Sequence, residues 1–163
     1  MSDTDGAATV GELAEYCQIR ARLLHGRAET LEAETASLLT DIDDDLSAVR
    51  AELDEHNSPT AESSPSGPDS TDSGDELANL EATEAELAEQ QAVVKAKQAR
   101  RAAFEALATD YLDIAETLEN ETPTASTAVT RILQFERDRD APTYFEDRET
   151  LLETAAKSNS DAP

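Results

Sequence analysis

The sequence predicts an all-α protein built on one long antiparallel, coiled-coil-like helical hairpin. Two short C-terminal helices pack at its base, and the termini and the tip loop are disordered. Three observations predict this fold. Two long stretches repeat apolar residues at helical spacing, a segment rich in Ser and Pro separates them, and no run alternates apolar and polar residues as a strand does. A chain of 163 residues corresponds to one domain, with or without linkers.

The first long helix is predicted over residues 9–56, after a polar N-terminus (1–8) that we expect to be disordered. Thr9 can cap this helix, because a Thr side-chain oxygen accepts a hydrogen bond from the first helical turn. Apolar residues then recur at spacings of three, four and seven, which is typical of a helix with one buried stripe. The stripe comprises Val10, Leu13, Cys17, Leu24, Leu31, Leu38, Leu39, Ile42, Leu46, Val49 and Leu53.

Residues 57–74 predict a disordered linker, because three prolines and two glycines among Ser, Thr and Asp can neither hold a helix nor bury a core. The second long helix is predicted over residues 75–121, with Asp75 as its cap. Two helices of nearly equal length joined by a loop favour an antiparallel hairpin. The second stripe comprises Leu77, Leu80, Leu87, Val94, Phe104, Leu107, Tyr111, Ile114 and Leu118.

Charge supports this pairing of the two long helices. In an antiparallel register that turns between residues 56 and 75, most basic residues of the hairpin meet carboxylates, which sets register and orientation as in coiled coils. The register places the basic run 95–101, including Lys97, beside the acidic run 29–34, including Glu34, and it places Arg20 near Asp110 and Arg27 near Glu105.

Residues 122–157 predict two short helices, one over about 126–139 and one over about 143–157, and residues 158–163 a disordered tail. Pro123 ends the second long helix and Pro142 separates the short ones. Because the short helices are tethered to the base of the hairpin, we expect all six aromatic residues to share one core there. This core defines a stable head, and the other end of the hairpin is an acidic arm. The aromatic residues are Tyr16, Phe104, Tyr111, Phe135, Tyr144 and Phe145.

The composition indicates adaptation to salt. The chain carries 37 Asp and Glu against 13 Lys and Arg, for a formal charge of -24, and only three of the basic residues are Lys. Such a charge opposes compaction unless salt shortens the Debye length, to about 3 Å at 1 M. Abundant carboxylates with few lysines resemble the proteins of halophilic archaea, which implies non-specific association of K⁺ or Na⁺ with surface carboxylates. The alternative is a mesophilic, acidic, disordered protein, which the helical periodicity disfavours.

The acidity also disfavours several classes of partner. Nucleic-acid binding requires a basic stripe that replaces counterions on phosphate, and an anionic membrane repels this chain. The N-terminus lacks the basic and apolar regions of a signal peptide, and no apolar run approaches the ~20 residues of a membrane span. We therefore expect a cytoplasmic protein that binds neither nucleic acid directly nor a membrane. The single Cys17 excludes an intramolecular disulfide and is expected to be buried.

One acidic segment has the spacing of a calcium loop. Asp41, Asp43, Asp45 and Glu52 match ligand positions of an EF-hand, but Leu46 stands where the loop needs Gly, and the helical period continues through it. The sequence therefore predicts no metal, no cofactor and no catalytic residue.

The remaining candidate site is a partner-binding patch in the C-terminal helices. Guanidinium groups bind carboxylate or phosphate oxygens in pairs, so a local excess of arginine can bind a partner; the alternative is pairing with the Asp and Glu residues beside them. The candidate residues are Arg131, Arg137, Arg139, Arg148, Tyr144 and Phe145.

The resulting functional hypothesis is a non-enzymatic protein–protein interaction or scaffold module. A long hairpin exposes much side surface, so we expect a homo-oligomer or a complex with helices of another protein, and no small-molecule substrate. The alternative is an acidic regulatory protein of a nucleic-acid machine, which binds a basic partner or mimics the charge of DNA. A small enzyme or metal protein is the third hypothesis.

Overall fold

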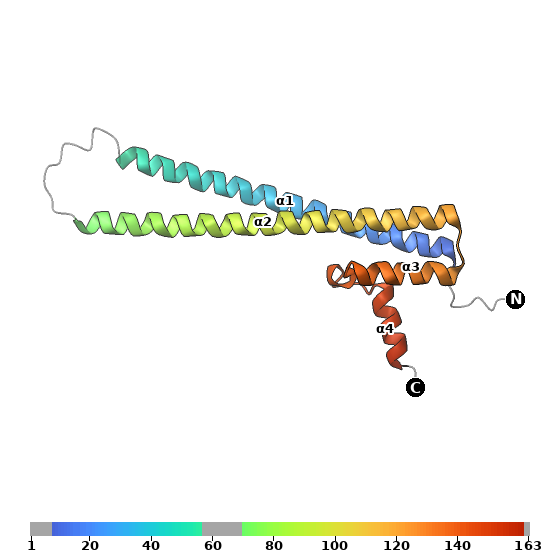
Figure 1. The fold of residues 1–163 in the computed structure, drawn as a ribbon. Helices are drawn as coiled ribbons and strands as arrows, with labels where there is room; N and C mark the ends of the chain where they lie inside the picture. The colour runs from blue at the N-terminus through green and yellow to red at the C-terminus, as the bar shows by residue number, and fades with distance from the viewer. Residues whose placement is uncertain (1–7, 57–69, 162–163) are drawn as a thin grey trace. The chain divides into compact units, whose positions relative to one another are not determined.

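The computed structural model describes residues 8–56 and 70–161, with side chains over 8–55 and 77–160, and the described residues form helices and no strand (Figure 1). There are four described α-helices: α1 (Val10–His56), α2 (Ser70–Glu121), α3 (Ala125–Asp138) and α4 (Leu151–Asp161). A 3-10 helix, η2 (Ala141–Tyr144), lies between α3 and α4. The predicted all-α class, with a long antiparallel hairpin of α1 and α2 and short C-terminal helices, is confirmed.

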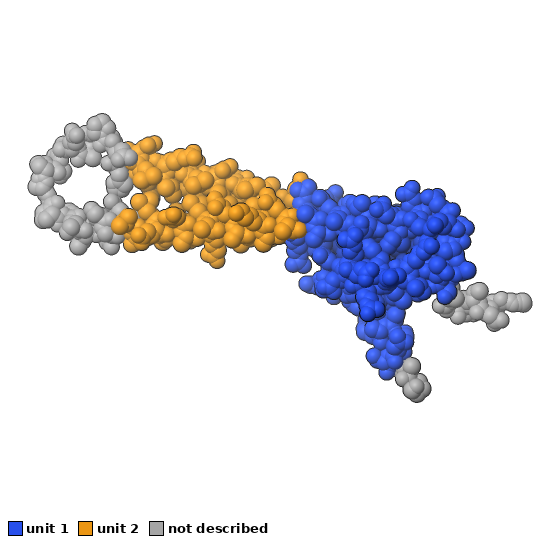
Figure 2. Space-filling view, in the orientation of Figure 1, with its two compact units in different colours: residues 1–30, 100–163 blue, residues 31–99 orange. Residues whose placement is uncertain are grey.

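The chain forms two compact units, coloured separately in Figure 2. The head comprises residues 1–30 and 100–163, and so contains the beginning of α1, the end of α2, and all of α3, η2 and α4. The arm comprises residues 31–99, and so contains the rest of α1 and the beginning of α2.

Helix α1 begins where the sequence places it. The Thr9 hydroxyl accepts a hydrogen bond from the Glu12 backbone N–H at 3.1 Å, and the Glu12 carboxylate accepts one from the Thr9 backbone N–H at 3.1 Å. This reciprocal capping box satisfies two amides that a helix N-terminus otherwise leaves open. The predicted cap is confirmed, and residues 1–7 of the predicted disordered N-terminus lie outside the described residues.

Helix α2 begins earlier than predicted. It starts at Ser70, so residues 70–74 of the predicted linker are helical, and residues 57–69 lie outside the described residues. The segment STDSGDE supplies Ser and Asp, which favour a helix N-terminus, and a single Gly costs a helix only about 1 kcal/mol. The prediction gave too much weight to Gly74.

The last helix also differs from its prediction. Helix α4 spans Leu151–Asp161 instead of residues 143–157, and residues 145–150 between η2 and α4 are not helical. The Arg148 and Glu149 carbonyls of this segment accept hydrogen bonds from Arg20, and Arg27 bonds the Tyr144 carbonyl at the end of η2, so these carbonyls do not close helical turns. Thr150 then caps α4 by accepting a bond from the Glu153 N–H at 3.3 Å. Residues 158–161, predicted as a tail, belong to the helix.

The head core holds the aromatic residues together, as predicted. Tyr111 is the centre: its ring lies edge-on to Phe135, Phe145 and Tyr16, with centroids 4.8, 6.2 and 6.4 Å away. Phe104 packs edge-on against Tyr144 at 5.4 Å. Aliphatic residues from three helices complete the core, among them Leu13, Leu24, Leu107, Leu118 and Ile132.

The arm is a two-helix seam with few buried side chains. Ile42, Val94 and Thr35 are the buried residues among its described side chains. The Lys97 Nζ lies 2.6 Å from a Glu34 carboxylate oxygen, which agrees with the antiparallel register that the sequence predicts.

Two predicted charge pairs of the head are wrong. Asp110 pairs with Arg139 at 3.2 Å instead of with Arg20, and Glu105 pairs with Arg101 at 3.1 Å instead of with Arg27. The predicted register considered α1 and α2 alone. In the structure, backbone carbonyls of residues 144–149 accept the hydrogen bonds of Arg20 and Arg27.

Candidate functional site

A carboxylate lies at the centre of the head. Ala128, Ile132 and Glu136 follow each other at intervals of four on α3, so they share one face, and all three side chains are completely buried. A buried carboxylate is costly unless hydrogen bonds surround it. Glu136 therefore identifies the most unusual chemical environment of the described head.

Two tyrosine hydroxyls and the first turn of α4 surround this carboxylate. Tyr111 donates to Glu136 Oε2 at 3.0 Å, and Tyr16 donates to the same oxygen at 3.0 Å with Oε1 at 3.3 Å. The Tyr16 hydroxyl also accepts from the Leu151 backbone N–H at 2.8 Å, and the Leu152 backbone hydrogen-bonds to the Glu136 carboxylate. Four helices thus meet in one hydrogen-bond network around Glu136. We call Glu136, Tyr16 and Tyr111, together with Arg20, whose charge acts on the Glu136 carboxylate, the carboxylate cluster.

Burial dominates the ionisation of the carboxylate cluster. Desolvation raises the pKa of Glu136, although the two tyrosine hydroxyls, Arg20 and the α4 backbone lower it in part. Burial and the Glu136 carboxylate likewise raise the pKa of both Tyr16 and Tyr111 above the ordinary tyrosine value. Both tyrosines therefore remain hydrogen-bond donors at neutral pH.

Arg20 fastens the segment before α4 to α1. Its guanidinium stacks 4.5 Å from the Phe145 ring centroid and 5.1 Å from that of Tyr16, and it donates to the backbone carbonyls of Arg148 and Glu149. The side chain is nearly buried, so these contacts are shielded from water and from salt. Arg20 thus holds the segment before α4, and Tyr16 and Glu136 hold the first turn of α4.

Cys17 is a buried thiol, as predicted. It is completely enclosed, and burial together with the Glu136 carboxylate raises its pKa to about 12. A nucleophilic cysteine needs a lowered pKa and access to a substrate, and Cys17 has neither.

The hydrogen bonds of the carboxylate cluster hold the helices of the head in place. A general acid or base must reach the proton that it transfers, and Glu136 has no exposed surface. Within the part of the chain that the structure describes, no group of three or more His, Cys, Asp and Glu side chains could hold a metal. Residues 41–52, with the spacing of a calcium loop, lie in the uninterrupted helix α1.

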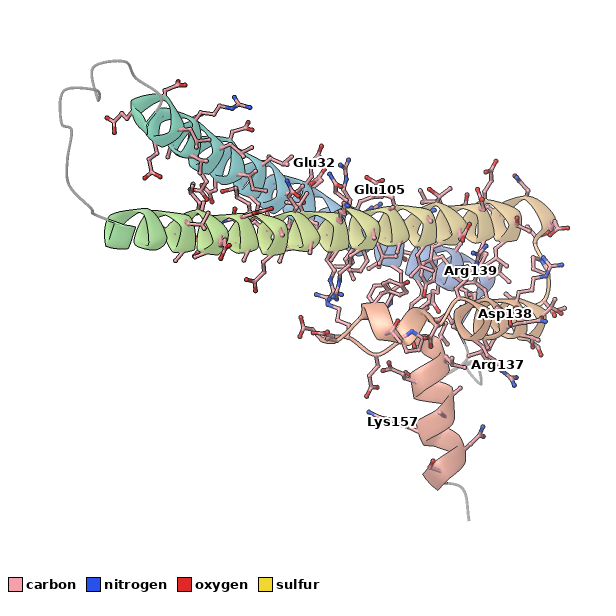
Figure 3. The ribbon with its side chains drawn as sticks, turned by 60° about the vertical axis from the view of Figure 1, so that its left-hand side comes forward. Glu32, Glu105, Arg137, Asp138, Arg139 and Lys157 are labelled. Carbon is pink, nitrogen blue, oxygen red and sulfur yellow. The ribbon has the colours of Figure 1, made fainter. Side chains whose placement is uncertain are left out.

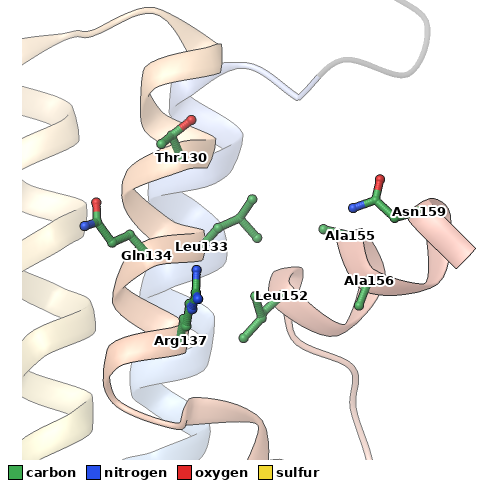
Figure 4. Close-up of a pocket in the computed structure, with 8 residues that line it drawn as sticks. All are labelled: Thr130, Leu133, Gln134, Arg137, Leu152, Ala155, Ala156 and Asn159. Atoms are coloured by element: carbon green, nitrogen blue, oxygen red, sulfur yellow. The ribbon is translucent and has the colours of Figure 1, made fainter.

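A groove opens between α3 and α4, next to the first turn of α4, which the carboxylate cluster holds in place (Figure 4). Its volume is about 500 Å³. Helix α3 contributes one face of two turns, and α4 contributes another face with the same spacing. The lining residues are Thr130, Leu133, Gln134 and Arg137 from α3, and Leu152, Ala155, Ala156 and Asn159 from α4.

The structure separates the arginines of the predicted patch. Arg131 pairs with Glu121 at 2.7 Å, and Arg139 pairs with Asp110 on the α2 side of α3. Arg137 leaves α3 on the other side and lines the groove (Figure 3). The fourth, Arg148, has an exposed side chain in the segment between η2 and α4.

The predicted aromatic residues belong mainly to the core. Phe145 is buried, and Tyr144 is half-buried against Phe104. Tyr144 and Arg139 line a smaller hollow of about 210 Å³ with Asp110. Of the candidate residues, only Arg137 thus lines the α3–α4 groove.

Sequence reasoning missed Glu136 as a buried residue. The signal was present, because Glu136 follows the apolar Ala128 and Ile132 at helical spacing and so lies on the buried face of α3. Acidic residues are almost never fully buried without partners, and here the partners come from segments 25 and 120 residues away in the chain.

Comparisons of the chain with protein families, with curated proteins and with solved structures give no match. No described helix is long and apolar enough to cross a membrane.

Proposed function

We propose that this chain is a non-enzymatic helical interaction module adapted to concentrated salt in a cytoplasm. In this proposal the arm assembles with the arm of a second copy into a bundle, and the head is the stable part that carries it. The proposal concerns self-assembly first, because most of the exposed large apolar residues among the described side chains lie on the arm.

The observation that carries the proposal is the apolar surface of the arm. Leu39 is 44% exposed and Leu77 is 58% exposed, and Leu53 and Val93 are exposed as well. Two helices bury only the side chains that face each other, so an amphipathic stripe of normal width stays partly open until more helices cover it. Scattered exposed leucines are common on protein surfaces, but here they accompany a seam in which only three of the described side chains are buried.

Two polar atoms in the arm support the same interpretation. The Thr35 hydroxyl oxygen and the Gln90 carbonyl oxygen Oε1 are buried without a hydrogen-bond partner among the described residues. An unsatisfied buried polar group costs about 1–3 kcal/mol. Polar groups in helical seams commonly select register and partner number, because a matching helix supplies the missing bond.

The charge of the chain makes the proposed assembly dependent on salt. With a formal charge of -24, two copies repel each other at low ionic strength. Concentrated KCl shortens the range of this repulsion to a few ångströms, so that apolar contacts can form. We therefore expect a folded oligomer in concentrated KCl and a monomer in dilute buffer.

Analytical ultracentrifugation at about 2 M KCl and at low salt tests the proposal. Leu39→Glu should abolish association, because it places a charge in the proposed interface. Ile19→Glu is the matched control, since Ile19 is a similarly exposed apolar residue (40%) in the head. Circular dichroism of both variants verifies that they fold.

A monomer in concentrated KCl, with full helicity, would contradict self-assembly through the arm. If that monomer bound a basic protein in a salt-dependent way, the result would favour the alternative function, an acidic regulator of a nucleic-acid machine. Equal loss of association in Leu39→Glu and Ile19→Glu would contradict an interface confined to the arm.

A further inference from the structure

We propose that the α3–α4 groove binds an amphipathic helix of a different protein, and that this helix presents a carboxylate to Arg137. The inference concerns the head and does not depend on self-assembly of the arm. It rests on the shape of the groove, on its polar and apolar lining, and on the charge balance around Arg137.

The spacing of the lining residues suits a helix. Positions 130, 133, 134 and 137 on α3 and positions 152, 155, 156 and 159 on α4 both follow the i, i+3, i+4, i+7 pattern of one helix face. Two such faces that diverge from a common contact form a trough about two turns long, roughly 10 Å. A third helix fits there by the same ridge-and-groove packing that joins the helices of a bundle.

The lining of the trough is apolar at its centre and polar at its margins. Leu133 and Leu152 supply half-buried apolar surface, and Ala155 and Ala156 are small enough to let another backbone approach closely (Figure 4). The polar residues stand around them and can bond the polar edge of a bound helix. This lining recognises an apolar stripe of medium-sized side chains. The polar lining residues are Thr130, Gln134, Arg137 and Asn159.

The charge balance around Arg137 selects a carboxylate. The neighbouring arginines are engaged, Arg131 of α3 with Glu121 and Arg139, directly after α3, with Asp110. The exposed Arg137 guanidinium forms no ion pair or hydrogen bond with the residues that the structure describes. In a chain with 37 acidic and 13 basic residues, an unpaired arginine beside an apolar groove is the feature that a partner's carboxylate would complete.

A second copy of this chain fits the groove less well than a different protein. Among the described side chains of the head, the exposed large apolar residues are Ile19 on α1 and Leu112 on α2, and α4 lines the groove itself. The other exposed large apolar residues of the described chain lie on the arm. A second copy would also add a formal charge of -24.

The groove is formed before any partner binds. Tyr16 accepts the Leu151 N–H, Arg20 binds the carbonyls before α4, and Glu136 bonds the first turn of α4. The α4 wall is therefore anchored at its first turn, beside Leu152. Preorganisation of this kind lowers the entropic cost of binding.

A synthetic helix with a switchable charge tests the inference. The probe is a fluorescent peptide of about 14 residues, or four turns, with a Leu and Ala stripe at i, i+3, i+4, i+7 and one Glu beyond the stripe. A second peptide carries Lys at that position. Fluorescence anisotropy follows the binding of each to the full chain at about 2 M KCl.

We expect the Glu peptide to bind the natural chain more tightly than the Lys peptide. Arg137→Ala should weaken the Glu peptide roughly tenfold, as for loss of one close charge pair, and Arg137→Glu should reverse the preference in favour of the Lys peptide. Arg131→Ala is the matched control and should change neither affinity. Ala156→Glu, at an exposed position in the trough, should block both peptides.

Three results would overturn the inference. One is that neither peptide binds the natural chain; another is that binding survives Ala156→Glu. The third is that Ala156→Glu dissociates an oligomer of the natural chain, which would make a second copy the occupant. Leu39→Glu should bind the Glu peptide normally, so failure of the groove and failure of arm assembly are distinguished.

Discussion

The head and the arm contain segments of the same two helices, α1 and α2, but these segments bury very different amounts of apolar side chain in the two units. In the head, α1 and α2 bury Leu13, Leu24, Leu107 and Leu118 among other residues. In the arm, the described side chains of α1 and α2 bury only Ile42, Val94 and Thr35. The apolar spacing along each helix is similar in both units, so the difference arises from the elements that cover the stripe.

Burial therefore depends on the number of helices that meet. In the head, α3, η2 and α4 add covering faces, and the added faces also enclose a carboxylate, an arginine and a thiol. In the arm, two helices meet along one line and leave apolar side chains in water. The same sequence pattern thus produces a core in one unit and an open, interface-like surface in the other.

The largest expected effect comes from removing the Glu136 carboxylate. Glu136→Ala leaves two tyrosine hydroxyls and the first turn of α4 without their hydrogen-bond partner, and it creates a cavity in the core. Breaking a buried charged network in this way costs about 3–5 kcal/mol. Unfolding at about 2 M KCl, followed by circular dichroism and by reaction of the buried Cys17 with a thiol reagent, measures the loss in the head.

Glu116→Ala is the matched control for this variant, because Glu116 is an exposed glutamate of the head. Its effect should stay within about 0.5 kcal/mol. If both variants unfold alike, the Glu136 carboxylate does not stabilise the head.

A smaller effect is expected from equivalent leucine truncations in the two units. Leu24 is completely buried in the head, so Leu24→Ala should cost about 2–5 kcal/mol. Leu38 is half-buried in the arm, so Leu38→Ala should cost only about 1 kcal/mol in the monomer. Thermal unfolding of dilute protein gives both values.

Repeating these measurements at concentrations where the chain associates sharpens the comparison. If the arm forms a bundle, the cost of Leu38→Ala should rise toward that of Leu24→Ala, because new helices then cover the side chain. A cost that is independent of concentration would show that the arm stripe is never covered by a second copy.

Much of this fold follows from the sequence because helical spacing is a local property. The stripes of α1 and α2, the Thr9 cap and the convergence of six aromatic residues needed only spacing and chain connectivity. The ion pair of Lys97 with Glu34 followed from the hairpin register, because in the arm no third element competes for either side chain.

The centre of the head could not be predicted in the same way. The partners of Arg20 and Arg27 are backbone carbonyls of residues 144–149, and the sequence around those residues favours a helix from Thr143 onward. Tertiary hydrogen bonds override that preference, since they use the carbonyls that a helix would need. Glu136 is an acidic residue, a type that is usually exposed, but it lies on the buried face of α3 and is enclosed by the core.

The smallest expected effect is a pH dependence confined to the head. Burial raises the folded-state pKa of Glu136, so between the unfolded value near 4.3 and the folded value the folded chain holds a proton that the unfolded chain has lost. Folding stability contributed by this group is therefore present at low pH and is lost as pH rises through the folded pKa. The groups that face it and modify this titration are Tyr16, Tyr111, Arg20 and Cys17.

Comparison with Glu136→Gln isolates this titration, because the surface carboxylates are common to both chains. The free energy of unfolding of the natural chain, minus that of Glu136→Gln, should fall as pH rises from about 4 and then level off. Glu116→Gln should give a difference without this slope. A difference that rises with pH would show that the tyrosine, arginine and α4 hydrogen bonds outweigh desolvation, and that the head favours the ionised carboxylate.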